Sequence, residues 1–177
     1  MKKIILIALV FLSVRMAQAQ YKPIGQGSSL KFTINNLGFG VDGTFSGFDG
    51  SVSFDPQNPA SCSFDITINA ATINTDNSLR DEHLKGESFF DVKDFPKIRL
   101  VSTKVSGNKG NYQFIGQLTI KGKSKAISFP FTSDALPSAD GYNFKGSFKM
   151  NRKDFGVGGT STVSDELEVN INVTVKK

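Results

Sequence analysis

The residues whose types suggest chemistry gather in one irregular stretch that interrupts an otherwise strand-like chain. This stretch holds the only histidine, His83, two positions after Asp81. One imidazole cannot build a multi-histidine metal site, and neighbouring residues on a helix point to different sides, so we predict no metal site. A histidine-activated nucleophile needs a serine or cysteine close in space, and Ser88 and Ser102 are candidates only by default. We therefore predict no catalytic residue.

Two arginines lie where the strand pattern breaks, Arg80 beside Asp81 and Arg152 near Asp154. Solvated surface turns are the usual explanation for such charged pairs. The other interpretation places them at the opening of a binding cavity, because the planar guanidinium suits the phosphate or carbonyl head of a ligand. On this interpretation, Arg80, His83 and Arg152 are candidate head-group contacts.

Two further features that look functional have plainer explanations. The run Gly38–Gly43 matches the dinucleotide fingerprint letter by letter, but more strand follows it instead of the helix that would hold a pyrophosphate. We therefore predict no cofactor. The single cysteine, Cys62, cannot form an internal disulfide and lies in a strand-like run, which favours a small core or wall residue over a nucleophile.

A short helical segment near residues 78–86 positions the polar side chains. Either residue of the Asn77–Ser78 pair can cap its first turn with a side-chain oxygen, and Gly86 can end it in a left-handed conformation. Leu79 and Leu84 are expected to form one apolar side of this turn. The double phenylalanine that follows suggests a plug on an all-β body.

The rest of the chain alternates apolar and polar residues with period two, the pattern of strands with one apolar face. Eight or nine such strands, each of about eight to ten residues, are separated by short turns such as Phe48-Asp49-Gly50 and Lys121-Gly122. Short connections favour antiparallel neighbours. Glycines inside strands and polar outer faces favour a barrel over a two-sheet sandwich. We predict an all-β fold with one closed, antiparallel, eight-stranded barrel.

An eight-stranded barrel is wide enough either to be filled by side chains or to hold one small ligand. The chain has 16 Phe and no Trp. One alternative is a packed aromatic core in an interaction protein; the one we favour is a tunnel for an elongated apolar molecule. An enzyme that acts on a lipid, using His83 with Asp81 or Arg80, is the least favoured. The inward candidates for contacting a ligand are Phe32, Ile34, Phe64, Ile66, Ile98, Leu100, Phe114, Leu118, Phe129, Phe144 and Phe148.

The first 19 residues have the composition of a cleaved secretory signal: a basic start, an apolar run over residues 4–14, and small residues before Gln20. Removing them lowers the formal charge from +5 to +2, because three of the 21 basic residues and none of the 16 acidic ones leave. We find no cluster of cations that would mark one face, so no nucleic-acid partner is predicted. We expect a periplasmic or secreted protein of one domain, residues 20–177.

Three blocks of residues resemble the conserved blocks of the YceI-like family. They are Thr75–Ser102, Gly116–Gly122 and Arg152–Val157. The first is the most specific, since it contains the run Arg-Asp-Glu-His-Leu and, a few residues later, Phe-Phe-Asp-Val. Together with the strands between Ser28 and Phe54, the resemblance spans almost the whole mature chain.

The resemblance implies an extended lipocalin-like barrel, exported to the periplasm, that binds a polyisoprenoid, an isoprenoid quinone or another long-chain lipid for transport or storage and is not an enzyme. Residues 20–177 are then a YceI-like lipid-binding barrel domain. The family often carries a histidine after the apolar alternation of the first strand, where this chain has Asn35-Asn36. Its head-group preference therefore need not match that of its relatives. Transient contact with a membrane and assembly into a homodimer are left open.

Overall fold

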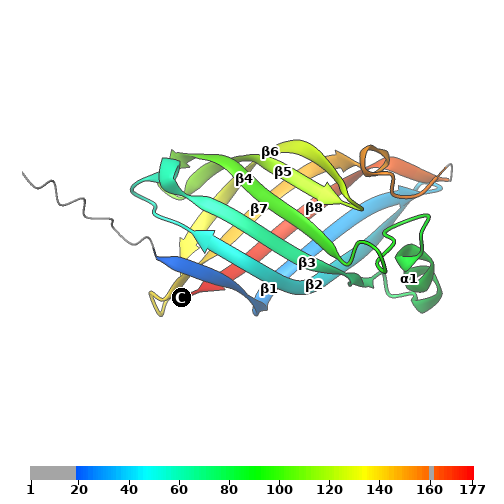
Figure 1. The fold of residues 1–177 in the computed structure, drawn as a ribbon, viewed down its shortest axis with the longest axis horizontal. Helices are drawn as coiled ribbons and strands as arrows, with labels where there is room; N and C mark the ends of the chain where they lie inside the picture. Colours follow the sequence, from blue (N-terminus) through cyan, green and yellow to red (C-terminus); the bar gives the residue numbers. More distant parts are fainter. Residues whose placement is uncertain (1–18, 160–161) are drawn as a thin grey trace, which may run out of the picture.

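A computed structural model describes residues 19–159 and 162–177. The predicted signal segment, except for its last residue, lies outside these ranges. Eight antiparallel strands follow one another around a closed barrel in the order of the sequence (Figure 1). The strands are β1 (Gln20–Asn36), β2 (Phe39–Ser53), β3 (Ser63–Asn74), β4 (Lys97–Asn108), β5 (Asn111–Ile120), β6 (Lys123–Ala135), β7 (Gly141–Asn151) and β8 (Val163–Lys176).

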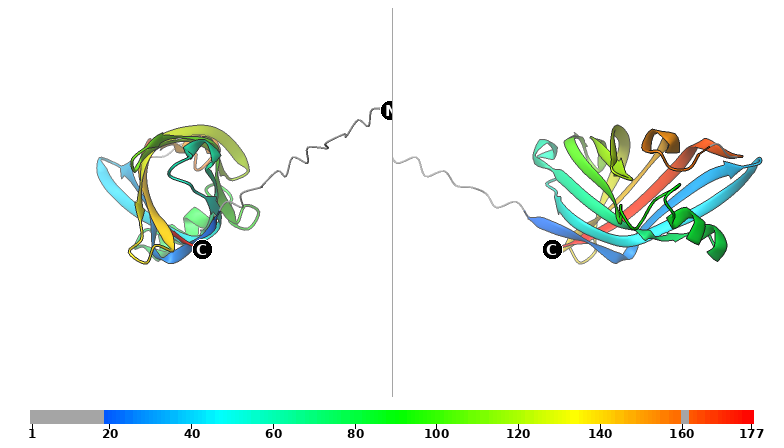
Figure 2. Two further views of the ribbon diagram at one scale, coloured as in Figure 1. Left: turned by 90° about the vertical axis from the view of Figure 1, so that its left-hand side faces the viewer. Right: turned by 45° about the vertical axis from the view of Figure 1, so that its right-hand side comes forward.

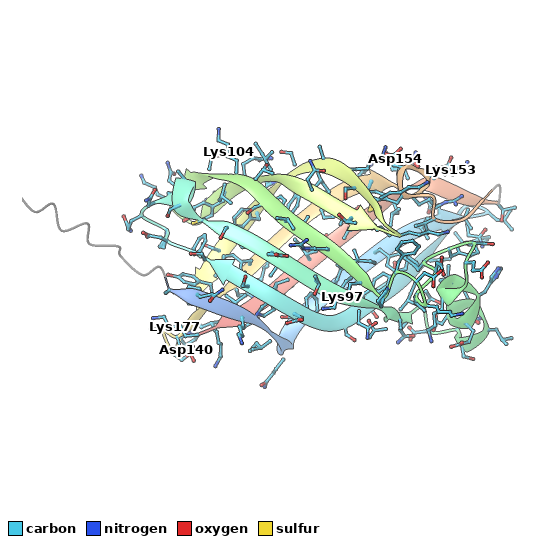
Figure 3. All side chains as sticks on the ribbon, viewed as in Figure 1. Lys97, Lys104, Asp140, Lys153, Asp154 and Lys177 are labelled. Atoms are coloured by element: carbon cyan, nitrogen blue, oxygen red, sulfur yellow. The ribbon has the colours of Figure 1, made fainter. Side chains whose placement is uncertain are left out.

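Pairing of the first and last strands closes the barrel and removes both sheet edges. Phe32 of β1 lies opposite Gly43 of β2 on one side and Val169 of β8 on the other. Because an unpaired edge strand would present free N–H and C=O groups along one side, closure gives every strand a neighbour on both sides. The predicted eight-stranded, antiparallel barrel is confirmed. Charged side chains such as Lys97 and Lys104 point away from it (Figure 3).

Two expectations about the strands were wrong. Phe48-Asp49-Gly50 lies inside β2 instead of forming a turn, so the segments before and after it are one strand. The pairing of β2 with β3 shifts register between Ser46 and Asp49, and Gly47 and Gly50 have φ of 71° and 124°. Asp-Gly suits a bulge as well as a turn, since both need positive φ. The strands are also longer than expected, 10 to 17 residues.

Three of the connections are two-residue hairpin turns with positive φ at both positions. They are Leu37-Gly38, Lys109-Gly110 and Lys121-Gly122, with φ of 52° and 85°, 49° and 83°, and 49° and 69° respectively. This geometry matches the right-handed twist of the flanking strands, and glycine is the natural choice for the second position. The hairpin Leu37-Gly38 and the turn Lys121-Gly122 lie at one end of the barrel, and Lys109-Gly110 at the other.

Three short helices cover the ends of the barrel. α1 (Ser78–Lys85) connects β3 to β4, and η2 (Arg152–Phe155) leads from β7 toward β8. Both lie at the end that carries Leu37-Gly38, which we call the α1 end (Figure 1). The third, η1 (Pro59–Ser61), lies at the opposite end, between β2 and β3. No helix within residues 19–159 and 162–177 is long and apolar enough to cross a membrane.

The end opposite α1 is filled by aromatic side chains. The ring of Phe54, one residue beyond β2, lies 5.3 Å from Tyr112, 4.9 Å from Tyr142 and 4.9 Å from Phe144, edge to face in each case. Such pairs contribute about 0.5–1.5 kcal/mol beyond their burial. Burial, with Tyr21 nearby, raises the pKa of Tyr142, so its phenol stays neutral. Figure 2 (left) views the barrel from this end. The expected packed aromatic core describes this part of the barrel only.

Cys62 lies behind this aromatic cluster as a wall residue, as expected. Its side chain is buried, and its sulfur accepts from the backbone N–H of Asp55 at 3.2 Å. Burial raises the pKa of the Cys62 thiol, which disfavours the reactive thiolate.

The thiol of Cys62 is expected to react with a water-soluble aromatic disulfide at pH 8 about tenfold or more slowly than a free cysteine. In denaturant the two rates should converge, because burial is then lost. The release of the chromophoric thiol measures both rates. A native rate equal to that of free cysteine would contradict the buried placement.

Candidate ligand-binding tunnel

α1 begins at a side-chain cap. Asn77 accepts a hydrogen bond from the backbone N–H of Arg80 at 3.0 Å, as one of the two expected caps. The helix ends at Gly86, as predicted, but Gly86 is extended, with φ −72° and ψ 169°, and not left-handed. The chain continues directly into a series of turns that returns residues 89–92 to the barrel. Backbone bonds from Phe90 N–H to Leu84 O and from Val92 N–H to Lys85 O hold that return.

A cluster of three residues, Thr75, Arg80 and Asp81, fixes α1 to the end of β3. One carboxylate oxygen of Asp81 accepts from the backbone N–H of Thr75 at 2.9 Å and from its hydroxyl at 2.6 Å. Arg80 donates through Nε to the Thr75 hydroxyl and through Nη2 to the Thr75 carbonyl, both at 2.7 Å. Thr75 and Asp81 are buried, at 5% and 9% exposure. The sequence neighbours Arg80 and Asp81 thus cooperate through Thr75.

Replacing Asp81 by Ala should destabilise the protein by about 1.5–3 kcal/mol, the usual value for hydrogen bonds to a charged group that leave a buried donor unpaired. Chemical denaturation measures this change, and hydrogen exchange in α1 should rise with it. The matched control is Glu82→Ala on the same helix. Glu82, whose side chain is 74% exposed, pairs with Lys85, so its removal should cost under about 0.5 kcal/mol. Equal losses in the two variants would contradict the anchoring role of Asp81.

A second covering segment, the loop from η2 to β8, is organised around Arg152. This guanidinium is 5% exposed. It donates to the carbonyls of Val157 at 2.9 Å, Ser164 at 3.0 Å and Val163 at 3.1 Å, and to the Asp165 carboxylate at 3.1 Å. Its donors therefore face the protein's own backbone. This differs from the interpretation in which Arg152 offers its fork to a ligand.

The two covering segments are joined to each other. The backbone N–H of Gly158 donates to the carbonyl of Ser88 at 2.8 Å. Lys121 reaches across from the β5–β6 turn to the carbonyls of Glu87 and Gly156. Gly158 has φ +71°, and a Cβ there would lie 2.6 Å from Arg152 Nη1 and 2.9 Å from the Phe89 ring. Only glycine fits this close approach, one residue beyond the third block of the family resemblance.

Beneath these segments lie two apolar cavities, one after the other along the barrel. The outer cavity, about 170 Å³, is next to α1. The inner cavity, about 90 Å³, extends toward the aromatic end. Five side chains line both cavities: Leu30, Ile68, Ile98, Leu118 and Phe148. The two cavities are therefore adjacent along the barrel, separated by these shared side chains, and we call the pair the tunnel. Four of its six polar lining residues line the outer cavity, at the α1 end.

All eleven apolar residues predicted to face inward line this tunnel. Those of the outer cavity alone are Phe32 and Ile34. Those of the inner cavity alone are Phe64, Ile66, Leu100, Phe114, Phe129 and Phe144. Those that line both are Ile98, Leu118 and Phe148. Whether these side chains contact a ligand stays a prediction.

The polar candidates differ in whether they line the tunnel. Arg80 and Arg152 line the outer cavity, together with Thr75 and Asn36. His83 is exposed and does not line either cavity; its ring lies edge to face with Phe89 at 4.9 Å. The i, i+2 spacing explains this difference, since Asp81 faces the barrel and His83 is turned away. Among the described residues, no group of three or more His, Cys, Asp or Glu side chains could hold a metal ion.

Several lining residues were not among the sequence candidates. They are contributed largely by the covering segment and by β2: Phe45, Leu84, Phe89 and Phe90. The Phe90 ring lies edge to face with Phe45 at 5.3 Å, which docks the segment on the barrel. The double phenylalanine was a signal for a plug. The two phenylalanine side chains point into the tunnel because backbone hydrogen bonds after Gly86 bring the chain back to the barrel.

These features define a class of protein: an antiparallel, lipocalin-like barrel with one packed end, one end covered by loops, and an apolar tunnel between them. The family model of the YceI-like domain matches residues 21–175, and the chain belongs to this family. A UPF0312 protein of Yersinia pestis is 33% identical over 174 residues, covering 94% of this chain and 91% of that protein. A UPF0312 protein of Yersinia enterocolitica is 32% identical with the same coverage.

Solved structures share the architecture. Burkholderia cenocepacia BcnA has a TM-score of 0.77 at 26% identity, covering 83% of this chain and 95% of BcnA. The Campylobacter jejuni YceI protein has a TM-score of 0.69 at 26% identity, covering 100% and 99%. A polyisoprenoid binding domain from Saccharophagus degradans, implicated in plant cell wall breakdown, has a TM-score of 0.70 at 12% identity, covering 90% and 99%. The last likeness is one of fold.

Proposed function

We propose that this protein is an exported, non-catalytic carrier or store that encloses one long-chain amphipathic lipid, a polyisoprenoid or an isoprenoid quinone. The observation that carries the proposal is the pair of apolar cavities that share five side chains. A cavity of about 150 Å³ with walls of this kind holds a benzene-sized group. A chain that uses the whole tunnel must therefore pass between the shared side chains, as a narrow and flexible prenyl chain does.

The energetics favour an elongated apolar ligand. Each buried methylene contributes about 0.8 kcal/mol before ordering costs. The 14 residues of β8, at a tilt near 40°, correspond to a barrel about 35 Å tall, although aromatic rings fill one end. The Saccharophagus degradans relative in fold, described as polyisoprenoid binding, supports the choice of a prenyl chain over an acyl chain.

The α1 end of the tunnel suits a small polar head. Asn36, Thr75, Arg80 and Arg152 line the outer cavity, but Asn36 accepts from Thr162 at 2.8 Å and the Arg152 donors face backbone carbonyls. Within residues 19–159 and 162–177, Arg80 donates through Nε and Nη2 to Thr75, which leaves Nη1 for a ligand oxygen. One such donor fits a hydroxyl or a quinone carbonyl better than a pyrophosphate, which recruits several cations.

The two other functions are less well supported. A solid interior would favour an interaction protein, whereas the barrel holds a tunnel. An enzyme built on His83 would need that side chain beside the ligand, whereas His83 is exposed. Export to the periplasm is proposed from the composition of residues 1–19 alone.

Native mass spectrometry tests the proposal on protein purified without detergent from cells that express the whole chain. We expect a discrete added mass that solvent extraction identifies as a prenyl lipid or quinone. The protein mass itself should correspond to cleavage after Ala19. Bare protein that also refuses added prenyl lipids would overturn the carrier proposal.

Two tryptophan variants on one strand make this test specific. Leu118→Trp places a bulky ring where the cavities join and should reduce lipid retention at least about tenfold, since the chain no longer passes. Gln117→Trp puts the same ring on the exposed outer face of β5 and should leave retention unchanged. Equal retention in both folded variants would place the lipid outside the tunnel.

A further inference from the structure

Large apolar side chains are exposed at few places on the described barrel, and most of them lie at its α1 end. Leu37 is 71% exposed, Phe39 76% and Leu79 84%, whereas Ile115, on the barrel wall, is 38% exposed. Leu37 and Phe39 form the tip of the β1–β2 hairpin, and Leu79 lies on α1. Both elements are at the same end of the barrel in each view (Figure 1 and Figure 2, right).

Folding of the chain by itself does not favour a leucine at position 37. It has φ +52°, a conformation that Asn, Asp and Gly adopt more readily than leucine. Lysine occupies the same position of the other two turns of this type, Lys109 and Lys121. Leu37 therefore combines backbone strain with an exposed apolar side chain, a combination that a contact outside the chain would explain.

Leu79 shows the same property on α1. The sequence suggested that Leu79 and Leu84 share one apolar side of the helix, and this was wrong. Five positions at 100° each place them about 140° apart. Leu84 lines the outer cavity, and Leu79 consequently points away from the barrel into solvent.

The charge at this end indicates what kind of surface the apolar tips can meet. The hairpin residues Asn35–Val41 carry no charged side chain. The segments 75–96, 121–122 and 152–162 together hold six Lys and Arg against seven Asp and Glu. This end therefore has no basic excess that would attract an anionic membrane, and its contact with lipid must depend on apolar insertion.

We propose that Leu37, Phe39 and Leu79 dock the α1 end of the barrel, which lies next to the outer cavity, onto the uncharged surface of a lipid bilayer, from which the ligand enters the tunnel. The purpose of this docking rests on the proposed function, but binding to a membrane can be measured independently of lipid carriage. Three side chains give weak, reversible binding, since even one myristoyl chain gives only marginal binding. A carrier needs such binding in order to leave the membrane again.

Co-flotation of the purified protein with phosphatidylcholine vesicles tests the docking directly. The unaltered protein should float with the vesicles, and the double variant Leu37→Asn, Phe39→Ser should reduce the bound fraction about tenfold or more. Leu79→Asn should reduce it by a smaller factor. The matched control, Ile115→Asn, also removes an exposed apolar side chain, from β5, and should float like the unaltered protein.

The design separates docking from folding. Leu37→Asn installs the residue that this turn prefers, so the melting temperature should stay the same or rise while flotation falls. Unaltered protein that does not float, or a double variant that floats equally well, would overturn the proposal. So would flotation that requires phosphatidylglycerol and is lost in high salt, because the docking would then be electrostatic.

A second readout distinguishes failure of docking from failure of the proposed function. The rate at which a fluorescent prenyl quinone moves from phosphatidylcholine vesicles to the protein should fall about tenfold in the double variant, while its final loading from dilute ethanol stays unchanged. No loading of any variant would refute lipid carriage without affecting the flotation result. If the double variant instead converts a dimer to a monomer by light scattering and floats normally, these side chains are a contact between copies of this chain and the docking proposal is wrong.

Discussion

Replacing Phe148 by Glu is expected to lower the amount of retained lipid about a hundredfold. Phe148 is one of the five side chains common to both cavities, and its ring stacks on Phe129 at a centroid distance of 4.9 Å. A ligand that occupies the tunnel must desolvate the new carboxylate, which costs several kcal/mol, and each 1.4 kcal/mol is a factor of ten in affinity. Quantifying extracted lipid per protein by mass spectrometry measures the effect.

Ser147→Glu is the matched control for Phe148→Glu. Ser147 is the preceding residue of β7 and is exposed on the outer face, so the same carboxylate there should leave retention unchanged. If Phe148→Glu does not fold, Phe148→Ala provides a second test, in which lipid retention should improve instead of falling. The smaller side chain would join the two cavities and should allow a longer prenyl chain to be retained. A folded Phe148→Glu that keeps its lipid would show that the tunnel is not the binding site.

Replacing Arg152 by Met is expected to destabilise the protein by about 3 kcal/mol. The guanidinium is 5% exposed and donates to four backbone carbonyls and to Asp165. Removal leaves these acceptors unpaired, at about 1–3 kcal/mol for each fully buried group. Water that reaches the less buried of these carbonyls lowers the total cost in stability. Urea denaturation measures the change, and hydrogen exchange should increase first in the loop before β8.

Lys153→Met is the control for Arg152→Met. Lys153 pairs with the other oxygen of Asp165 at 2.9 Å, but its side chain is 48% exposed, so its loss should cost under about 1 kcal/mol. Arg152→Lys should resemble Arg152→Met, because a single ammonium group cannot reach carbonyls that lie in several directions. A loss below 1 kcal/mol for Arg152→Met would mean that the loop holds its shape without this side chain.

Much of the barrel could be predicted because its signal is local. Side chains of a strand alternate between two faces, so one phase of each apolar run had to face inward, and all eleven candidates line the tunnel. The turn Lys121-Gly122 was predicted for the same local reason. Phe48-Asp49-Gly50 was misread because a bulge and a turn draw on the same residues. Only the pairing with β3 distinguishes them.

The polar residues were harder to assign because their roles depend on partners elsewhere in the chain. The candidates Arg80, His83 and Arg152 were equivalent on sequence grounds. In the structure, Arg80 donates to Thr75 and also lines the outer cavity, whereas His83 is exposed. Arg152 donates to a loop that lies 5 to 13 residues further along the chain. No residue pattern encodes which donors a folded loop will use.

The fold class, the family and the inward face of the strands are predictable without coordinates, since period-two alternation and the three blocks of family resemblance are properties of neighbouring residues. Contacts between distant segments place the aromatic rings at one end of the barrel, make Phe148 a wall of both cavities, and bring Leu37, Phe39 and Leu79 to the α1 end. These features arise when strands and loops distant in sequence meet. Their physical cause is barrel closure, which brings the start of β1 against the end of β8 and the covering loops against each other.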